Sequence, residues 1–165
     1  VTKIRDGLAA GVRGQNEAAF RRSAFIESNR SLPLNMLATF DLPEMKPNCD
    51  RRRSTTVATQ SLWFLNDDQI IGLTGGLADR LFTNNPIKAD QRLDALFRKL
   101  FATAPTDEEK RYLSSFLGRQ EELFRADPNA EWQKKIKDQP DAPAKRALAA
   151  LAQVLMASNR FLYID

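Results

Sequence analysis

Apolar residues recur at the spacing of amphipathic helices through the last two thirds of the chain, whereas the first third shows no sustained period. The clearest stripe comprises Leu93, Leu96, Phe97, Leu100 and Phe101, at positions i, i+3, i+4, i+7 and i+8. Such spacing is typical of a helix that turns one face to the core. The pattern therefore predicts an all-α fold, in which an irregular N-terminal third precedes a bundle of about four to five helices.

Further helices are expected on both sides of this stripe. One covers 58–65, after a cap at Thr55 or Thr56, and the next carries Ile70, Ile71, Leu73, Leu77 and Leu81. Another has its buried face at Tyr112, Leu113, Phe116, Leu117, Leu123 and Phe124. The last helix, from Ala144 to about Ser158, directs Leu148, Leu151, Val154 and Leu155 inward. Shorter helices are expected after Pro33 and at Trp132–Lys137.

Polar residues mark where two of these helices begin. Asp67 is placed to cap the helix that follows it, since its carboxylate accepts hydrogen bonds from backbone N–H groups that lack a partner in the helix. Thr106 and Glu109 have the spacing of a capping box, in which each side chain serves the backbone N–H of the other. We therefore interpret the carboxylate pairs Asp67-Asp68 and Glu108-Glu109 as helix caps rather than as acid–base or metal sites.

Gly75 and Gly76 interrupt an apolar period that continues on both sides of them. Inside a helix each glycine costs roughly 1 kcal/mol relative to alanine, so the pair calls for a structural reason. Two interpretations fit: a kink, or the close approach of a second helix that only glycine allows. Because the period continues through the pair, we favour the close approach.

The chain ends on an apolar segment in which Phe161, Leu162, Tyr163 and Ile164 stand in a row. A flexible tail is normally polar, so we expect this segment to dock on the core. Asn159 follows the last helix and suits its C-terminal cap, because asparagine tolerates the left-handed conformation found there.

The stretch from Cys49 to Asn66, CDRRRSTTVATQSLWFLN, joins the irregular third to the helices, and we call it the joint. Its candidate site residues are Arg51, Arg52, Thr56, Gln60 and Asn66. With Arg53, Arg21, Arg22 and Arg30, the two arginines among them are suited to an anion pocket, because guanidinium groups bind phosphate or carboxylate through parallel hydrogen bonds.

The same residues also suit a purely structural role. The arginines have acidic neighbours in Asp41, Glu44, Asp50 and Asp67, and we favour ion pairs with these over an anion pocket. We expect Arg52, Thr56 and Gln60 to tie the irregular third to the helices through hydrogen bonds to backbone groups.

Composition excludes several kinds of site. The 165 residues include no histidine and one cysteine, which removes Ser-His-Asp and Cys-His catalysis, histidine-bearing zinc sites and haem ligation by a local histidine. We therefore expect no metal or cofactor in this chain. The net charge of +4 is modest, and aromatic residues do not alternate with the arginines, so nucleic acid is not an expected partner. No run approaches the roughly 18 apolar residues of a membrane span.

Four motifs resemble one family. They are RRSAFI at 21–26, LATFDLPE at 37–44, CDRRRSTTVATQSLWFLND at 49–67 and VLMASNRFLYID at 154–165. Together they resemble the planctomycete-type secreted domain of unknown function known as PSD-one. The resemblance extends over most of residues 21–165, which we expect to form a single helical domain, and leaves 1–20 as a lead-in segment.

The resemblance implies the C-terminal domain of a larger, multidomain exported protein, located in the periplasm or outside the cell. Such proteins often carry a cytochrome-c-like domain upstream, and haem c would belong to that part because this chain has no CxxCH motif. The expected partners are the upstream domains of the same polypeptide. No catalytic residue carries over from the family.

Two functional hypotheses follow. The first is an accessory or interaction domain without catalysis of its own. The alternative is a ligand-binding or enzymatic module with an anion pocket at the five joint residues, which would take a small molecule or a glycan.

Overall fold

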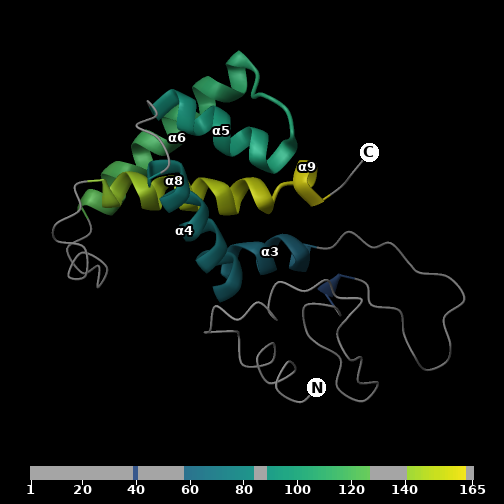
Figure 1. Ribbon diagram of the computed structural model, residues 1–165. Helices are drawn as coiled ribbons and strands as arrows, with labels where there is room; N and C mark the ends of the chain where they lie inside the picture. The colour runs from purple at the N-terminus through teal and green to yellow at the C-terminus, as the bar shows by residue number, and fades with distance from the viewer. Residues whose placement is uncertain (1–38, 41–57, 84–88, 127–140, 163–165) are drawn as a thin grey trace, which may run out of the picture. The chain divides into compact units, whose positions relative to one another are not determined.

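The structure is a computed structural model, and it describes residues 39–40, 58–83, 89–126 and 141–162. Within these residues it confirms the all-α prediction, since they contain helices and no strand (Figure 1). The helices are α3 (Ala58–Asn66), α4 (Asp68–Thr83), α5 (Ala89–Phe101), α6 (Asp107–Ala126), α8 (Ala142–Met156) and α9 (Asn159–Leu162).

Contacts between Cα atoms divide the chain into two compact units, Val1–Trp63 and Phe64–Asp165. In the first unit Thr39 is helical and Phe40 lies in a turn, close to the end expected for the helix after Pro33. The rest of that helix and the basic helix expected at Trp132–Lys137 lie outside the described residues. The single domain expected over 21–165 stays a prediction.

Helix α8 lies at the centre of the second unit, where it packs against α4 and α6 and also contacts α5 and α9 (Figure 1). Its buried positions are Ala142, Ala147, Leu148, Leu151, Ala152 and Leu155. The alanines among them have short side chains, so neighbouring helices can approach closely. From α5, the predicted stripe supplies Leu93, Leu96 and Phe97 to the same core. Burying one such large apolar side chain is worth roughly 1.5–3 kcal/mol.

The caps predicted at the starts of α4 and α6 are confirmed, whereas the cap expected at Thr55 or Thr56 lies outside the described residues. The Asp67 Oδ1 atom accepts hydrogen bonds from the backbone N–H groups of Gln69 at 2.9 Å and Ile70 at 3.3 Å. At the start of α6, the Thr106 N–H donates to Glu109 Oε2 at 2.7 Å and the Glu109 N–H donates to Thr106 Oγ1 at 3.2 Å. Asp67 forms no ion pair with another described residue, and the arginines of the joint lie outside the described residues, so their expected pairing with Asp67 stays a prediction.

No other helix of the described residues comes close to Gly75 or Gly76. A Cβ atom built on either glycine has no heavy atom within 4 Å among its described surroundings, apart from the backbone of its own helix. Helix α4 runs without a break from Asp68 to Thr83. The close approach expected at these glycines is therefore not found among the described residues.

Three residues expected in buried faces are exposed instead. Tyr112 and Leu123 of α6 are 67% and 62% exposed, and Val154 of α8 is 45% exposed. A helix turns by about 100° per residue, so Tyr112 and Val154 diverge from the neighbouring buried positions Leu113 and Leu155. The neighbouring helices cover the middle of each apolar stripe and leave its edge in solvent.

None of the helices in the described part of the chain is both long enough and apolar enough to cross a membrane.

Candidate functional site

The structure places two of the five candidate joint residues. Gln60 and Asn66 both belong to α3, whereas Arg51, Arg52 and Thr56 lie outside the described residues. A pocket built from all five therefore stays a prediction.

Gln60 is buried, with 6% of its surface exposed. Its Nε2 atom donates a hydrogen bond to the backbone carbonyl of Thr39 at 3.1 Å, across 21 residues of sequence. Next to Thr39, the Phe40 ring meets the Trp63 ring edge to face, with centroids 5.5 Å apart. A buried amide needs such partners, because an unsatisfied one costs about 1–3 kcal/mol. Within the first unit, the amide of Gln60 therefore holds α3 to the segment at Thr39.

Asn66 is exposed at the last position of α3. It follows Gln60 by six residues, which corresponds to a rotation of roughly 240° around a helix at about 100° per residue. Gln60 is buried and Asn66 is in solvent, so the helix separates these two candidate residues instead of bringing them together.

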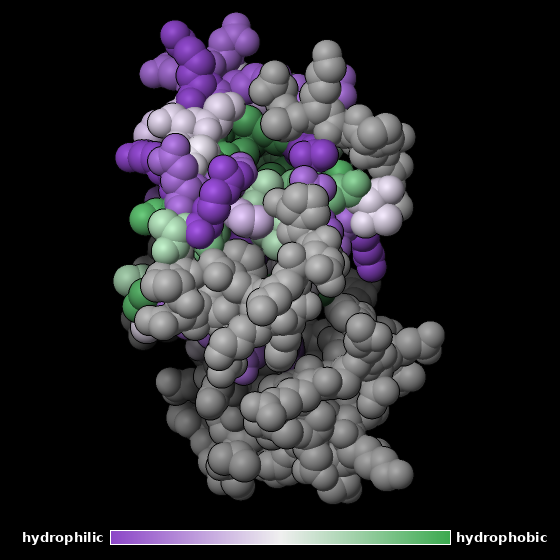
Figure 2. Space-filling view, turned by 90° about the vertical axis from the view of Figure 1, so that its left-hand side faces the viewer, coloured by the Kyte–Doolittle hydropathy of each residue, from purple (hydrophilic) through white to green (hydrophobic). Residues whose placement is uncertain are grey.

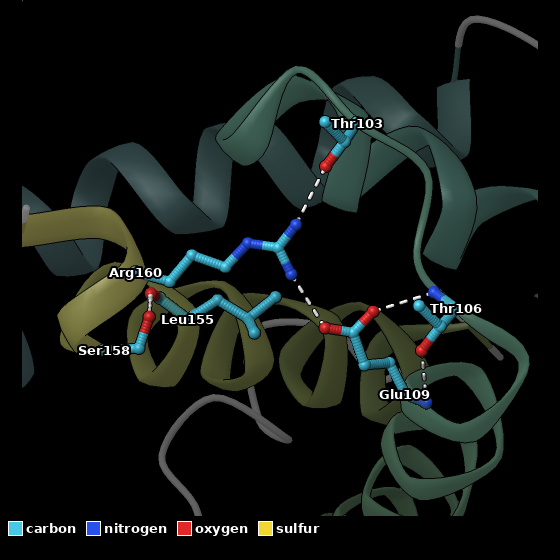
Figure 3. A network of polar contacts seen from close by, with 6 residues as sticks. All are labelled: Thr103, Thr106, Glu109, Leu155, Ser158 and Arg160. Atoms are coloured by element: carbon cyan, nitrogen blue, oxygen red, sulfur yellow. Dashed lines mark hydrogen bonds and ion pairs between the residues drawn. The ribbon is translucent and has the colours of Figure 1, made fainter. Parts of the chain in front are cut away.

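A second group of polar residues converges where the C-terminal segment meets the connection between α5 and α6 (Figure 3). The Arg160 Nη1 atom donates to Glu109 Oε1 at 2.7 Å, and its Nη2 atom donates to Thr103 Oγ1 at 3.0 Å. The other carboxylate oxygen of Glu109 accepts the N–H of Thr106, as part of the capping box. We call these four residues the Arg160 network. One guanidinium thus joins α9 to both ends of the α5–α6 connection.

Aromatic rings lie beneath the same guanidinium. The Arg160 Cζ atom is 5.0 Å from the centroid of Phe97 and 4.9 Å from that of Phe101, distances at which a cation is attracted to the ring face. The Phe161 ring packs edge to face against the rings of Phe64 and Phe101, with centroid distances of 5.7 Å and 6.4 Å. The docking predicted for residues 161–164 is therefore confirmed at Phe161, while 163–165 lie outside the described residues.

The predicted cap at Asn159 is wrong. Helix α8 ends at Met156 with Ala157 as its C-terminal cap residue, and the Ser158 Oγ atom donates to the Leu155 carbonyl at 2.6 Å (Figure 3). Asn159 instead begins α9. Because the serine hydroxyl donates a hydrogen bond to a carbonyl at the end of the helix, the turn does not require an asparagine in the left-handed conformation.

The contacts of Glu109 favour its charged form. The hydrogen bond from the Thr106 backbone N–H lowers the pKa of Glu109 from its ordinary value of 4.5, and the Thr106 hydroxyl and the Arg160 guanidinium lower it further. Partial desolvation opposes these effects by raising the pKa. The net result is a carboxylate that stays ionised and paired down to a lower pH than a free glutamate.

The Arg160 network is suited to holding helices in place. Its guanidinium is committed to a carboxylate, a hydroxyl and two rings, and its carboxylate is committed to a helix cap. Sequence reasoning did not single out Arg160 or Thr103. One signal was present: an arginine inside an apolar docking segment needs a partner for its charge.

Among the residues that the structure describes, no three or more His, Cys, Asp or Glu side chains gather as a metal ion would require.

The comparisons with known proteins place the chain in a family context. A sequence model described as "PSD1: Protein of unknown function (DUF1553)" matches residues 3–117. The matched span includes Gln60, Asn66 and Glu109, and it ends before Arg160. The chain has no significant match among curated proteins or among solved structures.

Proposed function

Because the chain belongs to the PSD1 family of proteins of unknown function (DUF1553), we propose that it is an accessory interaction domain of a larger exported protein. Its place would be at the C-terminal end of that protein, with the upstream domains of the same polypeptide as its partners. Where the protein also carries haem c, the haem would belong to an upstream cytochrome-c-like domain. The motifs of the joint and of the C-terminal segment support this assignment.

The observation that carries the proposal is the hydrogen bond from Gln60 to Thr39. An amide that binds a ligand must have its N–H groups available, whereas the Gln60 Nε2 atom is buried and donates to a backbone carbonyl. A joint whose polar groups serve backbone atoms stabilises the fold. This use of Gln60 favours a structural joint over a ligand pocket.

The Arg160 network adds independent support in the second unit. Arginine and glutamate side chains are common components of binding sites, yet Arg160 and Glu109 here bind each other and the ends of helices. Their polar groups hold the helices in place instead of binding a ligand. This use is expected of a domain that binds partners through its surface.

The alternative function is a ligand-binding or enzymatic module with an anion pocket at Arg51, Arg52, Thr56, Gln60 and Asn66. It requires the Gln60 amide to give up its hydrogen bond to the Thr39 carbonyl when the ligand binds. Exposed Asn66 would need to approach the same ligand from another face of α3.

The first experiment reads the open reading frame of the parent protein for a signal peptide and a CxxCH motif. Both are expected if the chain belongs to an exported, cytochrome-linked protein. An open reading frame without a signal peptide would contradict export, and one without additional domains would contradict the accessory role.

The second experiment tests the interaction itself. The 165-residue chain is titrated with the rest of the parent polypeptide in a calorimeter, and the intact protein is cross-linked and analysed by mass spectrometry. We expect saturable binding and cross-links from this domain to an upstream domain. The absence of both would contradict the proposal.

The alternative is tested with two variants of α3. If the joint is a pocket for an anion, Asn66→Ala and Gln60→Ala both weaken anion binding, and the side-chain amide signals of Gln60 and Asn66 shift during an NMR titration with phosphate. If the joint is structural, these signals do not shift, and Gln60→Ala lowers the stability of the chain while Thr59→Ala, at an exposed position of the same helix, does not.

A further inference from the structure

Two cations lie against one aromatic ring where α4 ends and α5 and α8 begin. The Arg92 Cζ atom of α5 is 3.9 Å from the centroid of the Phe82 ring, and the Lys145 Nζ atom of α8 is 5.8 Å from the same centroid. Phe82 belongs to α4, so three helices meet at this ring. Figure 2 looks onto the side of the molecule where these ends lie, and shows hydrophilic side chains beside apolar surface in its described part.

The two cations differ in their partners. The Lys145 Nζ atom forms an ion pair with Asp79 Oδ1 at 3.4 Å. Arg92 forms no ion pair with any described residue, and its Nε atom is buried without a hydrogen-bond acceptor. The carboxylate of Asp79 is thus bound to the lysine, whereas no carboxylate of the described residues pairs with the guanidinium of Arg92.

Such a guanidinium lacks part of the compensation that buried charges normally have. A charged donor removed from water is destabilised unless an acceptor or an opposite charge replaces the water. The Phe82 ring offsets part of this loss by a cation–π contact. It also holds the guanidinium plane in place, so the N–H groups at its outer end are already oriented for a ligand.

We propose that Arg92 and Lys145 bind a small oxyanion group beside Phe82. Carboxylate, phosphate and sulfate share the required chemistry, because each presents two or more oxygens to the fork of a guanidinium. Arg92 is only half-buried, so the terminal nitrogens can donate to the anion while Nε stays covered. Lys145 adds a second positive charge from another helix. This site shares no residue with the joint and does not depend on the proposed function.

The test is a titration of the 165-residue chain with sodium phosphate, sodium sulfate or sodium acetate, at an ionic strength kept constant with sodium chloride. The Arg92 Nε–H signal is followed by NMR, and the thermal midpoint is measured in parallel. We expect a saturable shift of this signal and a higher midpoint, because a ligand that binds the folded state stabilises it. A preference for acetate indicates a carboxylate ligand, and a preference for the other two indicates a phosphate or sulfate group.

Variants decide whether the two cations hold the anion. Arg92→Gln is expected to weaken binding by about tenfold or more, the effect of losing a charge-assisted hydrogen bond. Lys145→Gln is expected to weaken it less, since lysine contributes a point charge rather than a fork. Arg98→Gln is the matched control, because Arg98 is an exposed cation on the same helix, and it should leave binding unchanged.

Two outcomes would overturn the proposal. One is an Arg92 Nε–H signal that moves no more with the oxyanions than with chloride. The other is an Arg92→Gln chain that keeps its helical circular dichroism and binds with unchanged affinity. If Arg92→Gln does not fold, the wild-type titration and Lys145→Gln still decide the question.

Discussion

Arg160 donates a hydrogen bond to the Glu109 carboxylate across 2.7 Å of space and 51 residues of sequence. The same carboxylate caps α6, and the same guanidinium covers Phe97 and Phe101. The start of one helix, the end of another and the C-terminal segment are therefore held by a single pair of side chains. The first two predictions concern this pair.

Replacing Arg160 should destabilise the second unit although its ion pair is partly exposed. We expect Arg160→Ala to lower the free energy of unfolding by about 1–2 kcal/mol, since it removes an ion pair and two contacts with aromatic rings. Arg125→Ala is the control, because Arg125 forms an exposed pair with Glu121 within one helix and such pairs contribute about 0.3–0.5 kcal/mol. Urea denaturation measures both. Equal losses in the two variants would refute the role given to the network.

The free energy of unfolding should decrease at acidic pH because Glu109 becomes protonated. Its pKa is lowered in the folded chain from the ordinary value of 4.5, so the folded state binds the proton less readily than the unfolded state. The contribution is fully present above about pH 4.5 and is lost as the pH falls through the lowered pKa. Because the carboxylate is partly exposed, solvent screening keeps the effect small.

The measurement compares Glu109→Gln with the wild type across roughly pH 3 to 7 by urea denaturation. The stability difference between the two should shrink toward the acid end of the range. Glu108→Gln serves as the control, because Glu108 is an exposed neighbour that takes no part in the network. A difference between Glu109→Gln and wild type that is constant with pH would contradict the lowered pKa.

The two adjacent carboxylates at the start of α4 should differ in their effects. Asp67→Ala removes the acceptor for two backbone N–H groups and is expected to cost about 1 kcal/mol. Asp68→Ala removes only a negative charge from the first turn, which contributes a few tenths of a kcal/mol at an exposed position. Thermal denaturation of the two variants distinguishes them, and a larger loss in Asp68→Ala would show that Asp67 is not the cap.

The C-terminal segment should contribute to the stability of the whole second unit. Deleting 160–165 removes Arg160 and the Phe161 ring from their contacts, and is expected to cost several kcal/mol. Asn159→Ala is the control, because Asn159 is exposed and Ser158 serves the end of α8. A truncated chain that melts with the intact one would rule out docking, as would rapid hydrogen exchange at the amides of Phe161 and Leu162.

Gln60 should contribute more to the stability of the chain than Thr59, its neighbour in α3. Gln60→Ala removes the hydrogen bond to the Thr39 carbonyl and is expected to cost about 1–3 kcal/mol. Thr59→Ala is the matched control in the same helix, since Thr59 is exposed. An unchanged thermal midpoint in Gln60→Ala would refute the structural role of this residue.

Local sequence was sufficient for the starts of α4 and α6. The cap at Asp67 and the capping box at Thr106 and Glu109 use partners two or three residues away, so the spacing alone determines whether the hydrogen bonds can form. The stripe at Leu93, Leu96 and Phe97 likewise follows from the helical period, because these positions share one face. The family, too, was already indicated by short motifs.

Only the tertiary structure decided which residues meet over long distances. The sequence indicated that Gln60 would use its amide on a backbone group and that the C-terminal segment would dock, yet the carbonyl of Thr39 and the carboxylate of Glu109 become partners only through the packing of whole segments. The packing of the helices also decided that Tyr112, Leu123 and Val154 are exposed. A helical period shows which side chains share a face, but how far neighbouring helices cover that face depends on where those helices lie.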